Sequence, residues 1–315
     1  MNALAKLTDK NHPIFLTDAG LETWLVFNRG IELRDFAAFE LIHSEAGKAA
    51  LVDYWNEFLE LAQSQNRGFI LDTPTWRASP DWCQKLGFDL HEMEEINHDA
   101  TAFMHRIKDK HPISTPLVIN GLVGPRGDGY LPGRLMSVNA ARAYHSAQIT
   151  ALAKAGVDMI SALTMNNIAE AIGIAAAAKN VNIPCVISFT VETDGRLPTE
   201  QSLADAIRQT DAATENYPLY YMVNCAHPDH FRDTVRKDAE WLQRICGIRA
   251  NASRMSHAEL DKAEELDEGN PQELGNLHRE LLSLLPNMRV LGGCCGTDHR
   301  HVASIANQIP RYQHT

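Results

Sequence analysis

Three cysteines stand at the ends of two short apolar runs. Cys225 ends the run "LYYMVNC", and Cys294 and Cys295 end the run "MRVLGGCC". Thiolates favour soft or borderline metals, and three protein ligands beside an open fourth position are typical of a catalytic zinc site. An adjacent cysteine pair alone can also be a redox switch or core filler. Because both runs have the character of strands, their thiols could converge at one rim, which favours the zinc site.

The use of three thiolates indicates what such a metal would do. Three thiolates around Zn²⁺ leave a net charge of about −1, and a fourth thiolate from a substrate makes it about −2. The ion still displaces the proton of an incoming thiol, because metal binding competes with protonation. The bound sulfur stays electron-rich, so we predict that the three cysteines hold a zinc ion that activates a substrate thiol. Gly292, Gly293 and Gly296 would allow unusual backbone angles that turn both neighbouring side chains toward one ion.

The other three cysteines lie in or beside apolar segments and carry no such pattern. They are Cys83, Cys185 and Cys246. Six cysteines in 315 residues are too sparse for a disulfide scaffold, so we interpret these three as small buried side chains.

Eight apolar runs alternate with longer segments of helical character. Continuous apolar strands that alternate with helices indicate a parallel sheet covered by helices, and eight such units in this length predict an α/β fold of the (β/α)8 TIM barrel type. The expected strands are residues 13–20, 68–75, 116–124, 157–164, 184–191, 219–226, 246–253 and 288–295. The clearest helices are expected at residues 140–156, 167–180, 202–213 and 298–309.

The rival architecture is a doubly wound sheet. Such sheets usually carry a glycine-rich phosphate turn after the first strand, and "DAGLETW" at 18–24 lacks that spacing. We therefore predict one barrel domain over residues 1–315. The acidic stretch at 257–275 is interpreted as a solvated helix and loop near the rim.

Bulk composition excludes several classes of partner. The net charge of −11 argues against a nucleic-acid backbone. No apolar run approaches the roughly 20 residues that span a bilayer, and the first residues, "MNALAKLTDKNHP", contain no apolar signal core. We expect a cytoplasmic protein whose partners are small molecules, among them the thiol that the metal would activate, and the sequence leaves the oligomeric state open.

Several motifs together resemble the homocysteine S-methyltransferase family. "NCAHPDHF" at 224–231 and "GGCCGTDHRHV" at 292–302 are similar to its two zinc motifs. Weaker likenesses follow in chain order along nearly the whole chain, at residues 16–25, 72–79, 120–130 and 188–207. The resemblance implies a zinc-dependent (β/α)8 barrel that methylates the thiol of homocysteine to give methionine, a step of methionine biosynthesis.

The resemblance also implies roles for individual residues. Cys225, Cys294 and Cys295 would bind Zn²⁺. Asp18 would meet the ammonium of the amino acid, Thr73 would lie in its pocket, and Asn224 would orient the site beside Cys225. Two of these residues have plainer alternatives, because Asp18 could cap the following helix and Thr73 could bond within its own turn.

The chain departs from the family pattern at positions that bear on the substrates. Leu163 stands where the family usually has a glutamate that helps to hold the substrate ammonium, and the seventh strand reads "ANASRM" (250–255) in place of P-N-S-G-E. Arg77 stands where betaine-using relatives have a tyrosine. A cation is a poor neighbour for a quaternary ammonium, so we favour a sulfonium donor such as S-methylmethionine. Trp24, Trp76 and Tyr130 could contact a cationic donor, or could serve packing alone.

Two other functions remain open at this point. The same zinc chemistry could act on another thiol or a selenol, as the loss of the glutamate at Leu163 suggests. Alternatively, the protein could be a non-catalytic zinc- or redox-responsive protein in which Cys294 and Cys295 form a regulatory pair.

Overall fold

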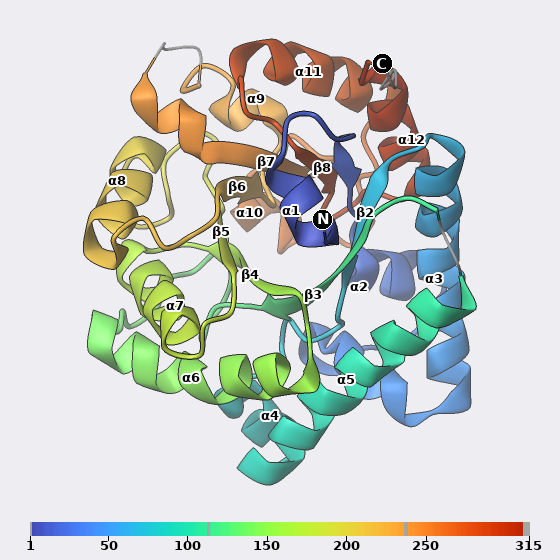
Figure 1. Ribbon diagram of the computed structural model, residues 1–315, viewed down its shortest axis with the longest axis vertical. Helices are drawn as coiled ribbons and strands as arrows, with labels where there is room; N and C mark the ends of the chain where they lie inside the picture. Colours follow the sequence, from blue (N-terminus) through green and yellow to red (C-terminus); the bar gives the residue numbers. More distant parts are fainter. Residues whose placement is uncertain (1, 112–113, 236–238, 311–315) are drawn as a thin grey trace.

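Eight parallel strands pair in chain order and close on themselves, since β8 pairs with β1. The computed structural model describes residues 2–111, 114–235 and 239–310. The strands are β1 (Phe15–Leu16), β2 (Gly68–Asp72), β3 (Leu117–Val123), β4 (Met159–Met165), β5 (Cys185–Phe189), β6 (Tyr221–Asn224), β7 (Ile245–Ala250) and β8 (Val290–Gly293). Each predicted run contains or overlaps one strand, and Figure 1 shows the closed ring with helices around it. The predicted (β/α)8 barrel is confirmed.

The first strand is much shorter than the predicted segment at 13–20. Only Phe15 and Leu16 pair with both neighbouring strands. The chain then turns at Gly20, which precedes a short helix and lies against the backbone of Cys294, where a side chain would have no room. Close packing against the end of β8 therefore ends β1 early and brings Asp18 to the rim.

Twelve α-helical segments surround the barrel or lie in its loops within the described residues. They are α1 (Ala3–Thr8), α2 (Leu21–Thr23), α3 (Glu45–Ser64), α4 (Pro80–Leu86), α5 (Leu90–Lys110), α6 (Val138–Ala155), α7 (Ile168–Asn180), α8 (Leu203–Thr214), α9 (Pro228–Phe231), α10 (His257–Leu260), α11 (Pro271–Leu284) and α12 (His299–Gln308). The four helices predicted most clearly correspond to α6, α7, α8 and α12.

Local capping explains where these helices begin and end. The side chain of Asn167 accepts a hydrogen bond from the backbone N–H of Glu170 at the start of α7. The side chain of Ser202 accepts one from the backbone N–H of Asp205 at the start of α8. Gly156 ends α6 in the left-handed region, at φ 91°, a conformation that costs glycine little. Because sequence-local groups make these caps, the boundaries could be predicted closely.

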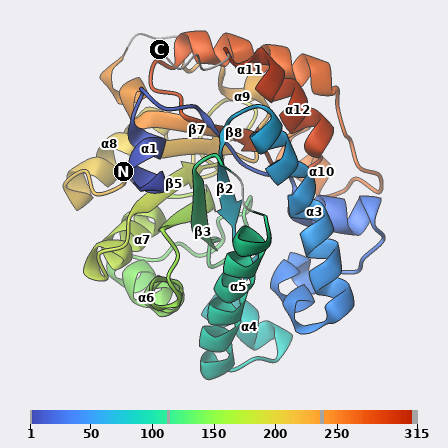
Figure 2. The same cartoon turned by 45° about the vertical axis from the view of Figure 1, so that its right-hand side comes forward.

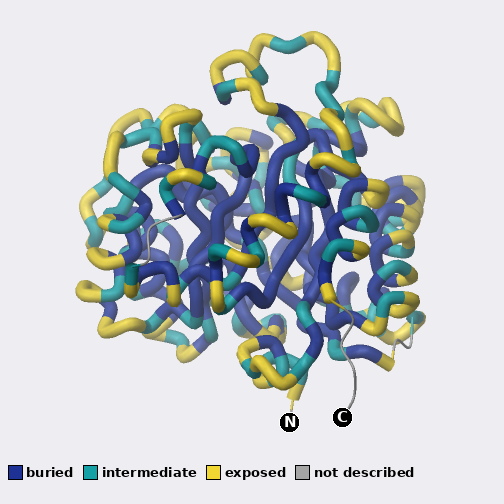
Figure 3. Tube along the Cα trace, turned by 90° about the horizontal axis from the view of Figure 1, so that it is seen from above, coloured by how far each residue is buried: buried dark blue, intermediate teal, exposed yellow. Residues whose placement is uncertain are grey.

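Two apolar layers hold the barrel together. Strand residues that point inward pack in the centre with Leu7 of α1, which closes the end of the barrel opposite the site. Strand residues that point outward pack against the surrounding helices. Figure 3 shows the buried strands in the middle and exposed segments outside, and Figure 2 shows α11 beside α12 on one flank.

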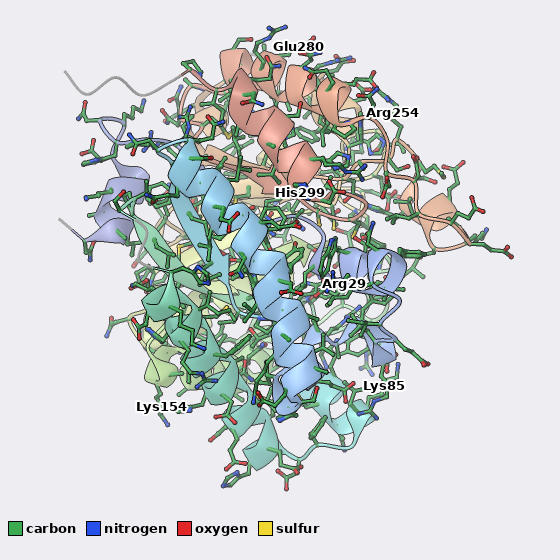
Figure 4. All side chains as sticks on the ribbon, turned by 90° about the vertical axis from the view of Figure 1, so that its right-hand side faces the viewer. Arg29, Lys85, Lys154, Arg254, Glu280 and His299 are labelled. Atoms are coloured by element: carbon green, nitrogen blue, oxygen red, sulfur yellow. The ribbon has the colours of Figure 1, made fainter. Side chains whose placement is uncertain are left out.

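Charged side chains gather on the outer helices. Figure 4 shows Lys85, Lys154 and Glu280 at the periphery. Pairs such as Arg29 with Asp53, 3.0 Å apart, are exposed, and such pairs contribute little to stability. In the described part of the chain, none of the helices has the length and apolar character needed to cross a membrane.

Candidate functional site

Three sulfur atoms from two loops meet at the carboxyl end of the barrel. Cys225 directly follows β6, and Cys294 and Cys295 directly follow β8. Their sulfur atoms all lie within 4.8 Å of one another, and those of Cys225 and Cys295 are 3.7 Å apart. The group could hold a metal ion. The predicted convergence of the three thiols is therefore present in the structure.

The thiols are oriented mainly by the backbone conformation of Cys225 and less by the flexibility of the neighbouring glycines. Cys225 itself adopts φ 54°, a left-handed conformation that is uncommon for a residue with a side chain and typical of functional sites. Gly296 also has positive φ, at 76°, as predicted. Gly292 and Gly293 do not, and their role was predicted wrongly. They are needed because a side chain there would collide with Thr17 and Thr297.

The three thiols change one another's pKa values because they lie so close together. Hydrogen bonds from Cys294 and Cys295 hold the pKa of Cys225 well below its ordinary range. The same contact with Cys225 raises the pKa of Cys295 and of Cys294. Adjacent thiolates repel one another, so all three can ionise together only beside a cation.

Asn224, the predicted orienting residue, is fixed by two neighbouring strands. Its Oδ1 accepts hydrogen bonds from Thr164 N at 2.9 Å and from Ser188 Oγ at 2.6 Å. Its Nδ2 donates to Thr164 Oγ1 at 3.0 Å and lies 3.9 Å from Cys294 Sγ. The amide thus ties β4 and β5 to the sulfur cluster.

A second group of side chains supports the cluster from its outer side. The hydroxyl of Tyr130 donates to Cys225 Sγ at 3.5 Å, and its ring stacks on His257 with centroids 4.0 Å apart. His257 Nε2 lies 2.7 Å from the carbonyl oxygen of Cys225, and its Nδ1 lies 3.1 Å from Glu192. Sequence reasoning missed His257, because only the fold of two loops brings it to the cysteines.

Asp18 belongs to a buried charge cluster that the sequence analysis did not anticipate. Arg249 of β7 pairs with Asp18 and with Asp72, and all three are at most 5% exposed. Asn120 donates to the other oxygen of Asp72 at 2.7 Å. Burial raises the pKa of Asp18 to about 7, against the lowering effect of Arg249. Asp18 does not cap a helix, since Gly20 precedes α2. The sequence did contain a sign of this cluster. An arginine inside the apolar strand "ICGIRA" needs a buried partner of opposite charge.

Thr73 lies in the cavity wall, but its hydroxyl is occupied. It accepts a hydrogen bond from Leu122 N at 3.0 Å and lies 2.6 Å from Thr75 Oγ1. The alternative of bonding within its own turn is thus realised, while the side chain still lines the cavity.

The cysteines open onto a cavity of about 530 Å³ whose wall contains many carboxyl groups. Among the described residues, its lining holds seven aspartates and glutamates against two arginines, Arg77 and Arg249. The predicted acidic loop near the rim forms part of the outer wall through Asp261 and Glu265, both exposed. Leu163 lies in the wall where a glutamate was expected.

Two further features of this cavity bear on ligands. Glu22 faces it, and burial raises the pKa of Glu22 to about 7. Trp76 and Tyr130 also line the cavity, whereas Trp24 packs against Tyr54 with ring centroids 5.2 Å apart. The two aromatic side chains in the wall could meet a cationic group, and Trp24 serves packing.

Comparison with known proteins connects this site to a family. The family model described as homocysteine S-methyltransferase matches residues 15–309. Homocysteine S-methyltransferase 1 of Arabidopsis thaliana is 20% identical over 184 residues, which cover 57% of this chain and 54% of that protein. The chain therefore aligns with about half the length of this curated relative.

Two solved structures share the fold at low sequence identity. The homocysteine methyltransferase MmuM from Escherichia coli in its oxidised form has a TM-score of 0.76 at 18% identity, covering 98% of this chain and 100% of that chain. Its metallated form has a TM-score of 0.74 at 20% identity with the same coverage. These likenesses show the barrel architecture.

Proposed function

The chain belongs to the homocysteine S-methyltransferase family, which classes it with methyltransferase enzymes, and from this premise we propose its reaction. It transfers a methyl group from a cationic donor to the thiol of homocysteine, giving methionine, with Zn²⁺ held by Cys225, Cys294 and Cys295. The observation that carries the proposal is the meeting of three sulfur atoms within 4.8 Å at the base of a cavity.

The cysteine cluster fits a zinc ion in chemistry and in size. Zn–S bonds of about 2.3 Å in a tetrahedron imply sulfur atoms about 3.8 Å apart, and Cys225 and Cys295 are separated by 3.7 Å. Three thiolates without imidazole suit a borderline metal in a site that needs no redox change. Bound there, zinc would supply the charge that keeps an incoming thiol deprotonated at neutral pH.

The acceptor amino acid is held by polar groups of the inner cavity. Asp18 pairs with Arg249 through one oxygen, and Tyr54 also forms a hydrogen bond with this carboxylate. The ammonium of homocysteine would be a further partner of the same group. Thr73 contributes to the pocket wall, and Asn224 keeps Cys294 in place through its amide. These residues orient the acceptor sulfur, and orientation supplies much of the catalysis in a direct displacement.

Carboxyl groups in the cavity wall favour a cationic donor. Asp18 and Asp72 are paired with Arg249, and among the described residues Asp128, Asp261, Glu265 and Asp267 also line the cavity. These four carboxylates would attract a cation and disfavour an anionic donor. His257 covers one face of the Tyr130 ring and Arg77 covers one face of the Trp76 ring, so the onium centre would meet the opposite faces. In the transfer, the bond from methyl to the donor sulfur breaks as the bond to the acceptor sulfur forms. A sulfonium donor leaves as a neutral thioether, and the acceptor's thiol proton passes to solvent.

A paired measurement of metal and activity tests the proposal. Protein purified under reducing conditions should contain about one zinc per chain and should form methionine from homocysteine and S-methylmethionine. Cys225→Ser should lose both, with at least a 1,000-fold lower rate, whereas Cys246→Ser, away from the cluster, should keep both. A folded wild-type protein without metal and without methyl transfer would support the redox-responsive alternative instead.

Leu163 favours one alternative acceptor within the same chemistry. Its apolar side chain lines the cavity where an additional anion was expected, so an acceptor without an ammonium would fit there better. A panel of thiols and a selenol with S-methylmethionine separates the two. Methylation of another acceptor without any methionine from homocysteine would replace homocysteine as the substrate.

A further inference from the structure

Cys225 has a backbone conformation that its surroundings must hold. Its φ of 54° lies in the left-handed region, which is unfavourable for a residue with a side chain and persists only where neighbours fix it. The carbonyl oxygen of Cys225 accepts hydrogen bonds from His257 Nε2 at 2.7 Å and from Thr190 Oγ1 at 3.3 Å. His257 makes the shorter contact and is 4% exposed. Its N–H is therefore the stronger of the two donors that keep this peptide in place.

The face of the same imidazole ring holds the tyrosine that contacts the Cys225 sulfur. The rings of Tyr130 and His257 are nearly parallel, 17° apart, with their centroids at 4.0 Å. Tyr130 Oη donates to Cys225 Sγ at 3.5 Å and lies 3.7 Å from Cys295 Sγ. His257 thus acts on Cys225 at two atoms, at the carbonyl oxygen directly and at the sulfur through Tyr130.

Two further contacts keep the ring of His257 in this orientation. Its Nδ1 lies 3.1 Å from Glu192 Oε1, in the loop after β5. Ser256 precedes α10, and its backbone N–H donates to Glu259 Oε2 at 2.8 Å, so that the helix begins at His257. Loops that follow β3, β5 and β7 therefore meet around Cys225, which follows β6.

The cysteine pair after β8 is held differently, by its own loop and by the end of β7. Cys294 N donates to Ala250 O at 2.8 Å, and Cys294 O accepts a hydrogen bond from Thr297 Oγ1 at 2.6 Å. Groups close in the chain or on the adjacent strand fix this pair, whereas Cys225 relies on side chains from other loops. A substitution of His257 should therefore reach the sulfur cluster through Cys225.

We propose that His257 is a positioning residue of the metal site, which fixes the carbonyl of Cys225 by its N–H and the sulfur of Cys225 through Tyr130. The inference rests on the proposed function, because it assumes a metal ion at the cysteines. Side chains that orient a ligand from outside typically change metal affinity by about 10- to 100-fold. A hydrogen bond to a thiolate also draws charge from the sulfur, so Tyr130 leaves the ion more positive toward an incoming thiol.

Competition for zinc with a chelator of known affinity tests the direct contact. His257→Phe keeps a flat ring against Tyr130 but removes the N–H, and should weaken zinc binding about 10- to 100-fold. His257→Gln restores a donor and should bind zinc within about fivefold of the wild type. A residue that served packing alone would show the reverse order, with His257→Phe tolerated and His257→Gln impaired. Zinc affinity in His257→Phe equal to that of the wild type would overturn the proposal.

His278→Phe is the matched control for this measurement. His278 of α11 is fully buried, and its Nδ1 lies 2.8 Å from the carbonyl oxygen of Leu274. It is thus a buried histidine beside a backbone carbonyl, in a helix on one flank of the barrel (Figure 2). His278→Phe should bind zinc like the wild type, even where it lowers stability. An equal loss of zinc affinity in His278→Phe and His257→Phe would show a general effect of removing a buried histidine and would overturn the role of His257.

The absorption spectrum of cobalt-substituted protein tests the contact through Tyr130. A hydrogen bond stabilises the sulfur electrons that the sulfur-to-cobalt charge-transfer transition removes, so its loss moves the band to longer wavelength. Tyr130→Phe removes one hydroxyl from a partly buried side chain, which the fold should tolerate, and should cause this shift. His257→Gln, which lacks the ring face, should shift the band in the same direction, and His257→Phe should shift it less. A band that none of these substitutions moves would overturn the link to the sulfur.

These metal measurements distinguish failure of this inference from failure of the proposed function, because they need no methyl transfer. Zinc binding that weakens in His257→Phe, in a protein whose wild type forms no methionine, would reject the reaction and keep the positioning role. Methyl transfer by the wild type, together with zinc affinity and cobalt spectra that the substitutions of His257 and Tyr130 leave unchanged, would reject the positioning role and keep the reaction.

Discussion

Two parts of the cavity wall are built on different principles. Around the cysteines, which follow β6 and β8, the side chains already have partners. Asn224, Tyr130 and His257 each make two or more contacts within the protein. Elsewhere in the wall, Arg77 after β2 forms no ion pair with a carboxylate among the described residues, and Leu163 of β4 offers no polar group. The surroundings of the cysteines are hydrogen-bonded without a ligand, whereas Arg77 keeps a charge that a ligand could meet.

This difference indicates how the two substrates are divided. A preorganised cluster of hydrogen-bonded groups suits a reacting atom that must be held in one geometry. An unpaired charge in an acidic, aromatic cavity suits a ligand that brings its own counter-charge. In the proposed reaction, the acceptor sulfur would be fixed at the cysteines, and the rest of the cavity would receive the donor.

The buried charge cluster gives the largest expected effect on stability. Arg249→Met leaves Asp18 and Asp72 buried without their shared cation, which should lower the free energy of unfolding by about 3–5 kcal/mol. Chemical denaturation at equal zinc content measures it. The exposed pair of Arg29 and Asp53 is the control, and Arg29→Met should cost less than about 1 kcal/mol. A loss below 1 kcal/mol in Arg249→Met would show that the charge cluster contributes little to the stability of the barrel.

The amide beside the cysteines should matter to the metal more than to folding. Asn224→Ala removes the group that joins Cys294 to β4 and β5, and should weaken zinc binding about 10- to 100-fold. Competition with a chelator of known affinity measures this. Asn287→Ala, whose side chain bonds to Gln243 at 2.7 Å before β8 begins, should bind zinc like the wild type. Unchanged zinc affinity in Asn224→Ala would mean that the cluster is not preorganised by its neighbours.

Glu22 supplies a smaller effect that depends on pH. Burial raises its pKa from 4.5 to about 7 in the folded protein, so the native state binds more protons than the unfolded state between these values. Stability from this group therefore falls as pH rises through that window. Glu22→Gln should make the protein more stable at pH 8 by about 2 kcal/mol, allowing for partial solvent access, and much less so at pH 5.

Denaturation of both proteins at the two pH values measures the difference. Glu265→Gln, on the exposed rim, should change stability by less than about 0.5 kcal/mol at either pH. An equal gain for Glu22→Gln at pH 5 and pH 8 would show that its carboxylate is not strained by burial.

The sequence predicted what depends on short-range patterns. Eight apolar runs indicated the strands because parallel strands buried on both faces are continuously apolar, and the order of strands then brought Cys225 close to Cys294. The pairing of Arg249 with Asp18 and Asp72 could not be predicted, because it joins strands far apart in the chain. The reason for glycine at positions 292 and 293 was also predicted wrongly. Glycine is required there because Thr17 and Thr297 leave no room for a side chain, and not because of the backbone angles. The ligand roles of the three cysteines stay a prediction.

X-ray absorption at the zinc edge tests the central claim most directly. With zinc-loaded protein, the account predicts three sulfur neighbours at about 2.3 Å and a fourth sulfur at the same distance when homocysteine is added. A shell of nitrogen and oxygen neighbours, or a sulfur count that homocysteine does not change, would contradict the assignment of Cys225, Cys294 and Cys295 as a thiol-activating metal site.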